Sequence, residues 1–139
     1  PDTTQFQLMK IMDKKNWSHI KVINLSDIRE PKSKIFCRKI NVIKQYDPDN
    51  IHSIFSDKRK NELKQILNSS TKIIVAWGVN SRLRNLIKLA LESNGGNNLN
   101  NRVGWNKKMK LKNDFYYYHP LPRYKKKRKQ WIKVILSKV

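Results

Sequence analysis

The chain has 139 residues, with 31 Lys and Arg against 10 Asp and Glu, a formal net charge of +21 at pH 7. This length suits one domain, and no apolar run approaches the roughly 18 residues that a membrane-spanning helix needs. The first residues lack the basic-then-apolar pattern of a secretory signal, and the single cysteine cannot form an internal disulfide. We therefore expect one α/β domain over residues 1–139, cytoplasmic and without a membrane partner.

The N-terminal part predicts a helix followed by a strand. Residues 3–15 predict a helix capped by a threonine, with Phe6, Met9 and Met12 as its inner stripe. The apolar run at residues 20–25, IKVINL, predicts a buried strand.

The middle of the chain begins with a segment that has no clear period, in which residues 35–43 predict either an edge strand or a lid. Ser56 is the expected cap of a helix over residues 57–68. A buried strand over residues 73–78, IIVAWG, comes next.

The C-terminal part continues the alternation. A helix capped by Asn80 or Ser81 is predicted up to about Glu92, then a tyrosine-rich strand at residues 115–118, and a final helix from about Arg123. Alternating helices and strands predict a three-layer α/β/α fold with a short, mainly parallel central sheet.

Three motifs occur in a fixed order: VINLSDIRE from Val22, IIVAWG from Ile73 and YYYHPLP from Tyr116. This order resembles the bacterial and phage family of unknown function DUF1643, whose members show a strand ending in Asn-Leu, a strand ending in Ala-Trp-Gly and a late His-Pro-Leu. The resemblance covers nearly the whole chain, although the family's usual N-terminal segment has a counterpart only in Asp2-Thr3-Thr4. The chain either starts naturally at Pro1 or lacks a first strand.

The same order is similar to the latter two thirds of uracil-DNA glycosylases, which implies a glycosylase-like fold. By this resemblance Asn24 reads the base, His119 supports charge that develops on the base, and Leu121 is the wedge that enters the duplex. The acidic motif that positions water in those enzymes has no counterpart here. Asp27 is the nearest candidate acid or base, so whether the protein is an enzyme stays open.

Ligands in open α/β sheets bind outside the carboxyl ends of the strands. We therefore expect a pocket lined by Trp77, Gly78, Tyr118 and Pro120. Four candidate residues also have a structural interpretation: Trp77 as core, Gly78 as a special backbone angle or close approach, and His119 and Asn24 as turn formers. Tyr116 to Tyr118 are candidates for base stacking. No metal or cofactor is expected, because the histidines have no partners at metal-ligand spacing.

Positive charge is concentrated late in the chain. Residues 71–139 hold 17 Lys and Arg against two Asp and Glu, and a basic run begins near residue 123. The candidate phosphate-binding residues are Arg123, Lys125, Lys126, Lys127, Arg128 and Lys129. Such charge favours nucleic acid, DNA first, as the partner. The alternative is compositional drift toward lysine, which outnumbers arginine 23 to 8.

Three functions follow from these patterns. The first is nucleic-acid binding on a glycosylase-like scaffold. The second is an enzyme acting on a base, nucleoside or nucleotide through the same pocket. The third is a non-enzymatic interaction or regulatory module whose charge is compositional.

Overall fold

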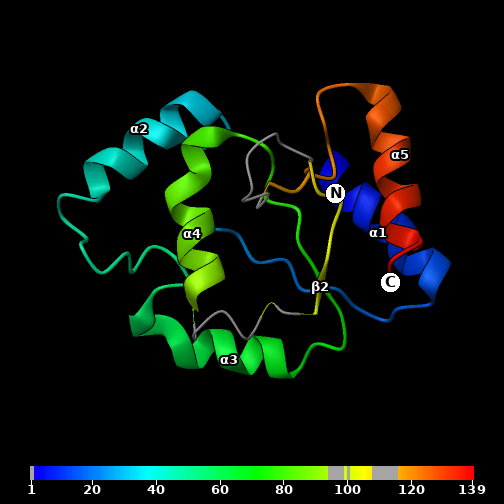
Figure 1. Ribbon diagram of the computed structural model, residues 1–139, viewed down its shortest axis with the longest axis horizontal. Coiled ribbons are helices and arrows are strands. Elements are labelled where there is room, and N and C mark those ends of the chain that lie inside the picture. Colours follow the sequence, from blue (N-terminus) through cyan, green and yellow to red (C-terminus); the bar gives the residue numbers. More distant parts are fainter. Residues whose placement is uncertain (1, 94–98, 100, 108–115) are drawn as a thin grey trace. The chain divides into compact units, whose positions relative to one another are not determined.

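The computed structural model describes residues 2–93, 99, 101–107 and 116–139 (Figure 1). In this part of the chain it is a mixed α/β protein with five α-helices and a two-stranded parallel sheet. Its contacts divide the chain into two compact units. The first unit comprises Pro1–Val22, Lys72–Val79 and Asn101–Val139, and the second comprises Ile23–Thr71 and Asn80–Asn100. The organisation of residues 1–139 as one domain stays a prediction.

The first unit is built around two helices that lie side by side, α1 (Thr3–Lys15) and α5 (Lys125–Leu136) (Figure 1). Their fully or nearly buried apolar residues form one cluster: Leu8, Ile11, Trp131 and Ile135. The predicted inner stripe of the first helix was therefore wrong in part, because Phe6 and Met9 are each 50% exposed. Packing against α5 selects the face of Leu8 and Ile11 instead.

The ends of α1 are fixed by local hydrogen bonds. Asp2, not a threonine, is the N-cap: its carboxylate accepts the Gln5 N–H at 2.9 Å, and the Gln5 side chain accepts the Asp2 N–H at 2.9 Å. This reciprocal pair is a capping box. Asn16 ends the helix in the left-handed region at φ 52°, which asparagine tolerates better than most residues.

The sheet of the first unit is short. Strand β1 (Ile73–Ile74) pairs in parallel with β2 (Arg102–Val103), with Ile73 opposite Arg102. Beyond this pair, Tyr117 makes antiparallel bridges to both Gly78 and Asn106. The parallel pair agrees with the predicted, mainly parallel sheet, whereas the described part of the tyrosine segment joins it only through the antiparallel bridges of Tyr117. Phe115, the expected first residue of the tyrosine strand, lies outside the described residues.

Gly104 is required where the tyrosine segment joins the sheet. A Cβ atom at this position would lie 2.4 Å from Tyr117 Cδ1 and 2.6 Å from the Val75 carbonyl oxygen. Both distances are too short for any side chain, so the tyrosine ring lies against bare backbone. The sheet can accept a bulky Tyr117 because residue 104 has no side chain.

The described residues of the second unit form three α-helices, of which the latter two each follow a 3₁₀ turn. In chain order its elements are α2 (Ser33–Ile43), η1 (Asp57–Arg59), α3 (Lys60–Asn68), η2 (Ser81–Leu83) and α4 (Arg84–Glu92). Its buried apolar side chains are Ile54, Phe55, Leu63, Leu86, Ile87, Ala90 and Leu99. The predicted helices at 57–68 and 81–92 are confirmed, with their first turns wound as 3₁₀ helix.

Caps in the second unit follow the predictions only in part. The Asn80 side chain accepts the Arg82 N–H at 3.0 Å, as expected of a cap. The Ser56 side chain makes no capping bond. It is instead buried, with 1% of its surface exposed.

Two predicted elements of the N-terminal half were wrong. Residues 20–25 form no strand, and Val22 is 58% exposed. Residues 35–43 lie in α2 and not in an edge strand, and the alternative that they act as a lid stays a prediction. Their apolar residues Ile35, Phe36, Ile40 and Ile43 follow helical spacing, which the scattered charges concealed. Within the described residues, no helix is long and apolar enough to cross a bilayer.

Candidate functional site

The loop after the tyrosine segment places His119 at the surface, just before two buried prolines. Pro120 and Pro122 are buried, whereas His119 is exposed. The Leu121 N–H donates to His119 Nδ1 at 3.1 Å. In the neutral ring the hydrogen is therefore on Nε2, which is left as a donor. Although the residue is exposed, partial burial of its ring lowers the pKa of His119, and Asp2 raises it by a smaller amount. The neutral donor is therefore the main form at pH 7.

A buried glutamine of α1 holds this loop against α5. Gln7 is 6% exposed, and its Nε2 donates to the carbonyl oxygens of Pro120 and Arg128, each at 3.4 Å. The Arg128 Nε donates to the Pro122 carbonyl oxygen at 3.3 Å. The sequence analysis missed Gln7; its only signal is that a polar side chain shares a helix face with Leu8 and Ile11.

The aromatic residues near this loop are packed against one another. The Tyr118 ring lies 4.4 Å from the Trp105 ring, centroid to centroid, and the Tyr118 hydroxyl is 3.3 Å from Lys127 Nζ. Tyr117 meets Trp77 edge to face at 5.6 Å. Trp77 and Tyr118 are half-buried, and for Trp77 this is consistent with the structural interpretation.

Gly78 has the special backbone angle that the sequence analysis allowed for. Its φ is +100°, and nothing lies within 4 Å of the position that a Cβ atom would occupy. The residue is therefore glycine because of its conformation and not because of a close neighbour. Its N–H donates to the Tyr117 carbonyl oxygen at 2.8 Å.

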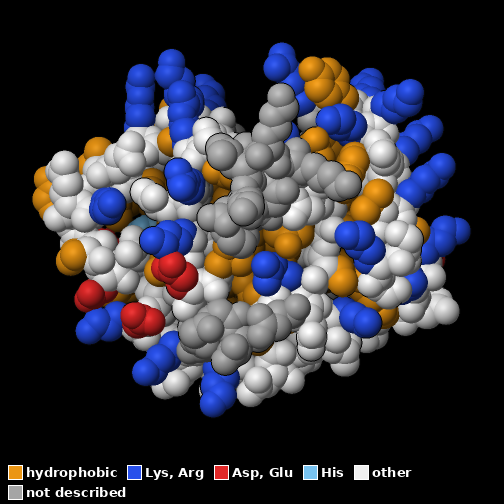
Figure 2. All heavy atoms as spheres, in the orientation of Figure 1, with side chains coloured by type: hydrophobic (Ala, Val, Ile, Leu, Met, Phe, Trp, Pro, Cys, Tyr) orange, Lys and Arg blue, Asp and Glu red, His pale blue; other side chains and the backbone are white. Residues whose placement is uncertain are grey.

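The basic residues of α5 divide into two sets. Lys127 and Arg128 are half-buried and bond Tyr118 and Pro122. The other set is exposed on the side of the helix away from Trp131 and Ile135; we call it the lysine face of α5, and it consists of Lys125, Lys126, Lys129 and Lys133. Figure 2 shows Lys and Arg side chains projecting along this helix. Arg123, just before the helix, is also exposed, and Leu121 is half-buried.

The start of α5 is electrostatically unfavourable in the free protein. Its N-cap residue, Tyr124, makes no side-chain cap bond, and its first turn contains no acidic residue. Lysines at a helix N-terminus oppose the helix dipole. The sequence of the first unit holds 18 Lys and Arg and three Asp, a net of +15, against 13 and seven, a net of +6, in the second.

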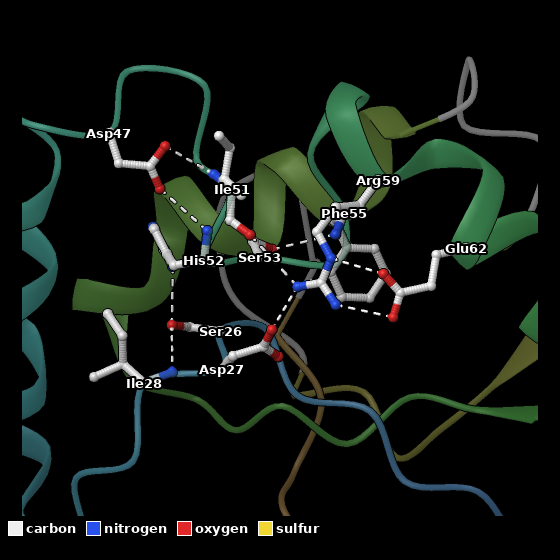
Figure 3. Close-up of polar contacts among 10 residues, drawn as sticks. All are labelled: Ser26, Asp27, Ile28, Asp47, Ile51, His52, Ser53, Phe55, Arg59 and Glu62. Carbon is white, nitrogen blue, oxygen red and sulfur yellow. Dashed lines mark hydrogen bonds and ion pairs between the residues drawn. The ribbon is translucent and has the colours of Figure 1, made fainter.

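The remaining predicted site residues, Asn24 and Asp27, lie in the second unit, and Asp27 is part of a polar network (Figure 3). Asp27 is exposed and forms an ion pair with Arg59. Arg59 also donates two hydrogen bonds to Glu62, at 2.8 and 2.9 Å. Asp27 therefore has a structural partner. Asn24 is exposed.

The same network contains a serine and a histidine that the sequence analysis did not connect. Ser26 Oγ lies 2.9 Å from His52 Nδ1 and accepts the Ile28 N–H at 3.2 Å. The Asp47 carboxylate accepts the N–H groups of Ile51 and His52, and the Ile51 bond is the main cause of a lowered pKa for Asp47. These contacts link residues 26–28 to the turn at 47–52 (Figure 3).

Some of the predicted site residues therefore contact one another in the first unit, and others belong to the second unit. Gly78 meets the tyrosine segment, and the His119 loop meets α5, all within the first unit. Asn24 and Asp27 belong to the second unit, so a pocket shared with His119 stays a prediction. Among the described residues, no three His, Cys, Asp or Glu side chains are grouped so as to hold a metal ion.

Comparison with known protein families shows to which family the chain belongs. A family model described as "Protein of unknown function (DUF1643)" matches residues 1–121. The chain belongs to this family. The DUF1643 match includes His119 and stops before α5, so the lysine face lies outside it. No curated protein and no solved structure matches the chain.

Proposed function

We propose that this DUF1643 protein binds nucleic acid, with DNA favoured, through the lysine face of α5 and Arg123. The observation that carries the proposal is the arrangement of four lysines on the exposed side of a helix whose opposite side is buried. This arrangement holds the charges on a fixed scaffold. A polyanion that lies along it gains phosphate contacts and releases its counterions.

Electrostatics within the first unit support this proposal. Within the described residues, no lysine of this face takes part in an ion pair. The unfavourable charge at the start of α5 would be relieved by a bound anion. The free protein therefore lacks the negative charge that a nucleic-acid backbone would supply.

The experiment compares two variants with the same change in charge. In the first, Lys125, Lys126 and Lys129 are each replaced by Gln; in the control, the exposed Lys44, Lys60 and Lys64 of the second unit are replaced by Gln. Binding to labelled single-stranded and duplex DNA is measured across a salt series. We expect the first variant to bind at least about tenfold more weakly, with a salt slope smaller by about 2 to 3, and the control to change little.

Two outcomes would overturn the proposal. Equal losses in the two variants would mean that net charge alone causes binding. Loss of all wild-type binding at about 150 mM salt would mean that the charge is compositional, and would favour the interaction-module hypothesis.

A second candidate function is an enzyme acting on a base, nucleoside or nucleotide on a three-layer, glycosylase-like scaffold. The His119 hydrogen bond favours it, because a neutral ring with a free Nε2–H can stabilise negative charge on a leaving base. In this hypothesis Asn24 reads the base and Asp27 is the acid or base. This hypothesis is supported if the wild type releases uracil from DNA and His119→Ala abolishes that release. It is contradicted if the wild type releases no uracil.

A further inference from the structure

We infer that the nucleic acid bound at this surface is single-stranded, and that one of its bases stacks on Tyr124. The inference rests on the proposed function and specifies the ligand of the same site. Tyr124 is 64% exposed and lies between Arg123 and Lys125, which are both exposed. It is therefore an exposed aromatic residue whose two neighbours in the chain are positively charged.

Two other tyrosines of the first unit are less available for stacking than Tyr124. Tyr117 packs against Gly104 and Trp77, and Tyr118 packs against Trp105. The stacking role that the sequence suggested for the tyrosine segment therefore fits these two rings poorly. Tyr124 combines high exposure with basic neighbours.

Tyr124 makes few contacts within the fold, and these contacts do not explain why a large aromatic residue is present at this position. Its side chain does not cap α5. Its one aromatic contact among the described residues is with Lys127 Nζ, 5.9 Å from the ring centroid, near the outer limit for a cation–π interaction. A large ring in this position is explained by a ligand that covers it.

The choice between single strand and duplex follows from the chemistry of stacking. In a duplex the two faces of each base are covered by neighbouring bases, whereas an unpaired base offers its face to a protein ring. The exposed Lys126, Lys129 and Lys133 recur three and four residues apart, on one side of α5, where they can follow a phosphate backbone. A duplex would use these lysines but gain nothing from Tyr124.

The test uses three variants: Tyr124→Ala, Tyr124→Phe and the control Tyr46→Ala, which removes a tyrosine that is 82% exposed in the second unit. Affinities are measured for a thymidine oligonucleotide of about 16 nucleotides and for a duplex of the same length. We expect Tyr124→Ala to weaken single-strand binding about tenfold and to leave duplex binding unchanged. Tyr124→Phe and Tyr46→Ala should bind as the wild type does. Circular dichroism and the melting temperature confirm that each variant folds.

The outcomes separate this inference from the proposed function. If the lysine-face variant loses binding while Tyr124→Ala keeps its preference for single strands, the inference fails and the proposed function stands. If Tyr124→Ala weakens the binding of both ligands equally, or if Tyr124→Phe binds as weakly as Tyr124→Ala, stacking of a base on Tyr124 is excluded. If the wild type binds neither ligand, the proposed function and the inference both fail.

Discussion

The indole Nε1–H of Trp131 donates a 2.8 Å hydrogen bond to the carbonyl oxygen of Tyr118. Trp131 has no exposed surface and lies in the core between α1 and α5. Tyr118 directly precedes His119 in the chain. One side chain therefore fills the core and also holds the residue from which the His119 loop starts.

Replacing Trp131 with Phe should destabilise the protein by about 3 kcal/mol, because it leaves a carbonyl without its donor and a cavity in the core. The half-buried Trp17, which borders the same cluster, provides the control Trp17→Phe. Urea unfolding should show a clearly larger loss for Trp131→Phe. Equal losses would mean that the hydrogen bond to Tyr118 contributes nothing measurable.

Replacing Gly104 with Ala should cost about 3 kcal/mol or more, because the new Cβ atom would overlap both Tyr117 and the Val75 carbonyl oxygen. Gly78→Ala should cost about 1 to 2 kcal/mol, since only its φ of +100° is strained. Thermal unfolding of the two variants checks that Gly104→Ala is the more destabilising. Tyr117→Ala should not rescue Gly104→Ala, because the contact with the Val75 backbone remains; full rescue would contradict this explanation.

Local sequence patterns predicted the helices better than the sheet. The helices at 3–15, 57–68 and 81–92 have apolar spacing or cap residues that are visible without tertiary contacts. The pairing of β1 with β2 joins Ile73 to Arg102, far away in sequence, and β2 lies in a basic segment with no strand pattern. The antiparallel position of Tyr117 likewise depends on the missing side chain of Gly104, which no periodicity shows.

The pH dependence of stability should contain a contribution from His119. Its folded-state pKa is lowered from 6.5, chiefly by loss of water around the ring. As the pH falls through about 6.5, the unfolded chain takes up the proton first, so stability falls until the folded-state pKa is passed. His119→Gln should flatten this part of the profile of the free energy of unfolding. An unchanged slope would mean that the folded protein accepts the proton without penalty.

Replacing Lys126 with Glu should stabilise the free protein by about 1 kcal/mol, because a carboxylate in the first turn of α5 complements the helix dipole. The melting temperature should rise by about 3 °C. The same variant should bind nucleic acid more weakly, as expected when a functional charge is kept at a cost in stability. A lower melting temperature would show that the lysine has a favourable partner in the free protein.

Replacing Arg59 with Lys should destabilise the second unit, because a lysine cannot form two hydrogen bonds to Glu62 while also reaching Asp27. We expect a loss of about 1 kcal/mol in urea unfolding. Lys58→Ala is the control: it removes a more exposed ion pair to Asp49, at 3.8 Å, and should change stability little. A larger effect of Lys58→Ala would contradict the role assigned to Arg59.

The candidate site combines features that are visible in the sequence with features that only the packing of the helices determines. The basic run at 125–129 is visible in the sequence, but its division into exposed lysines and the inward-bonded Lys127 and Arg128 follows from the orientation of α5 against α1. Gln7 and the Ser26–His52 pair were missed for the same reason. Their partners are distant in sequence, and each residue alone resembles an ordinary polar position.

The basic stretch of many proteins is a tail that can be removed without harm to the domain. Here the lysine face lies on the same helix as Trp131 and Ile135, which have no exposed surface, and Lys138 Nζ donates to the Gly104 carbonyl oxygen at 2.9 Å. Deleting the charged segment would open the core of the first unit. The exposed charges and the buried core residues therefore lie on the same helix. Substitutions can remove the lysines one at a time, but the segment that carries them cannot be deleted without loss of the core.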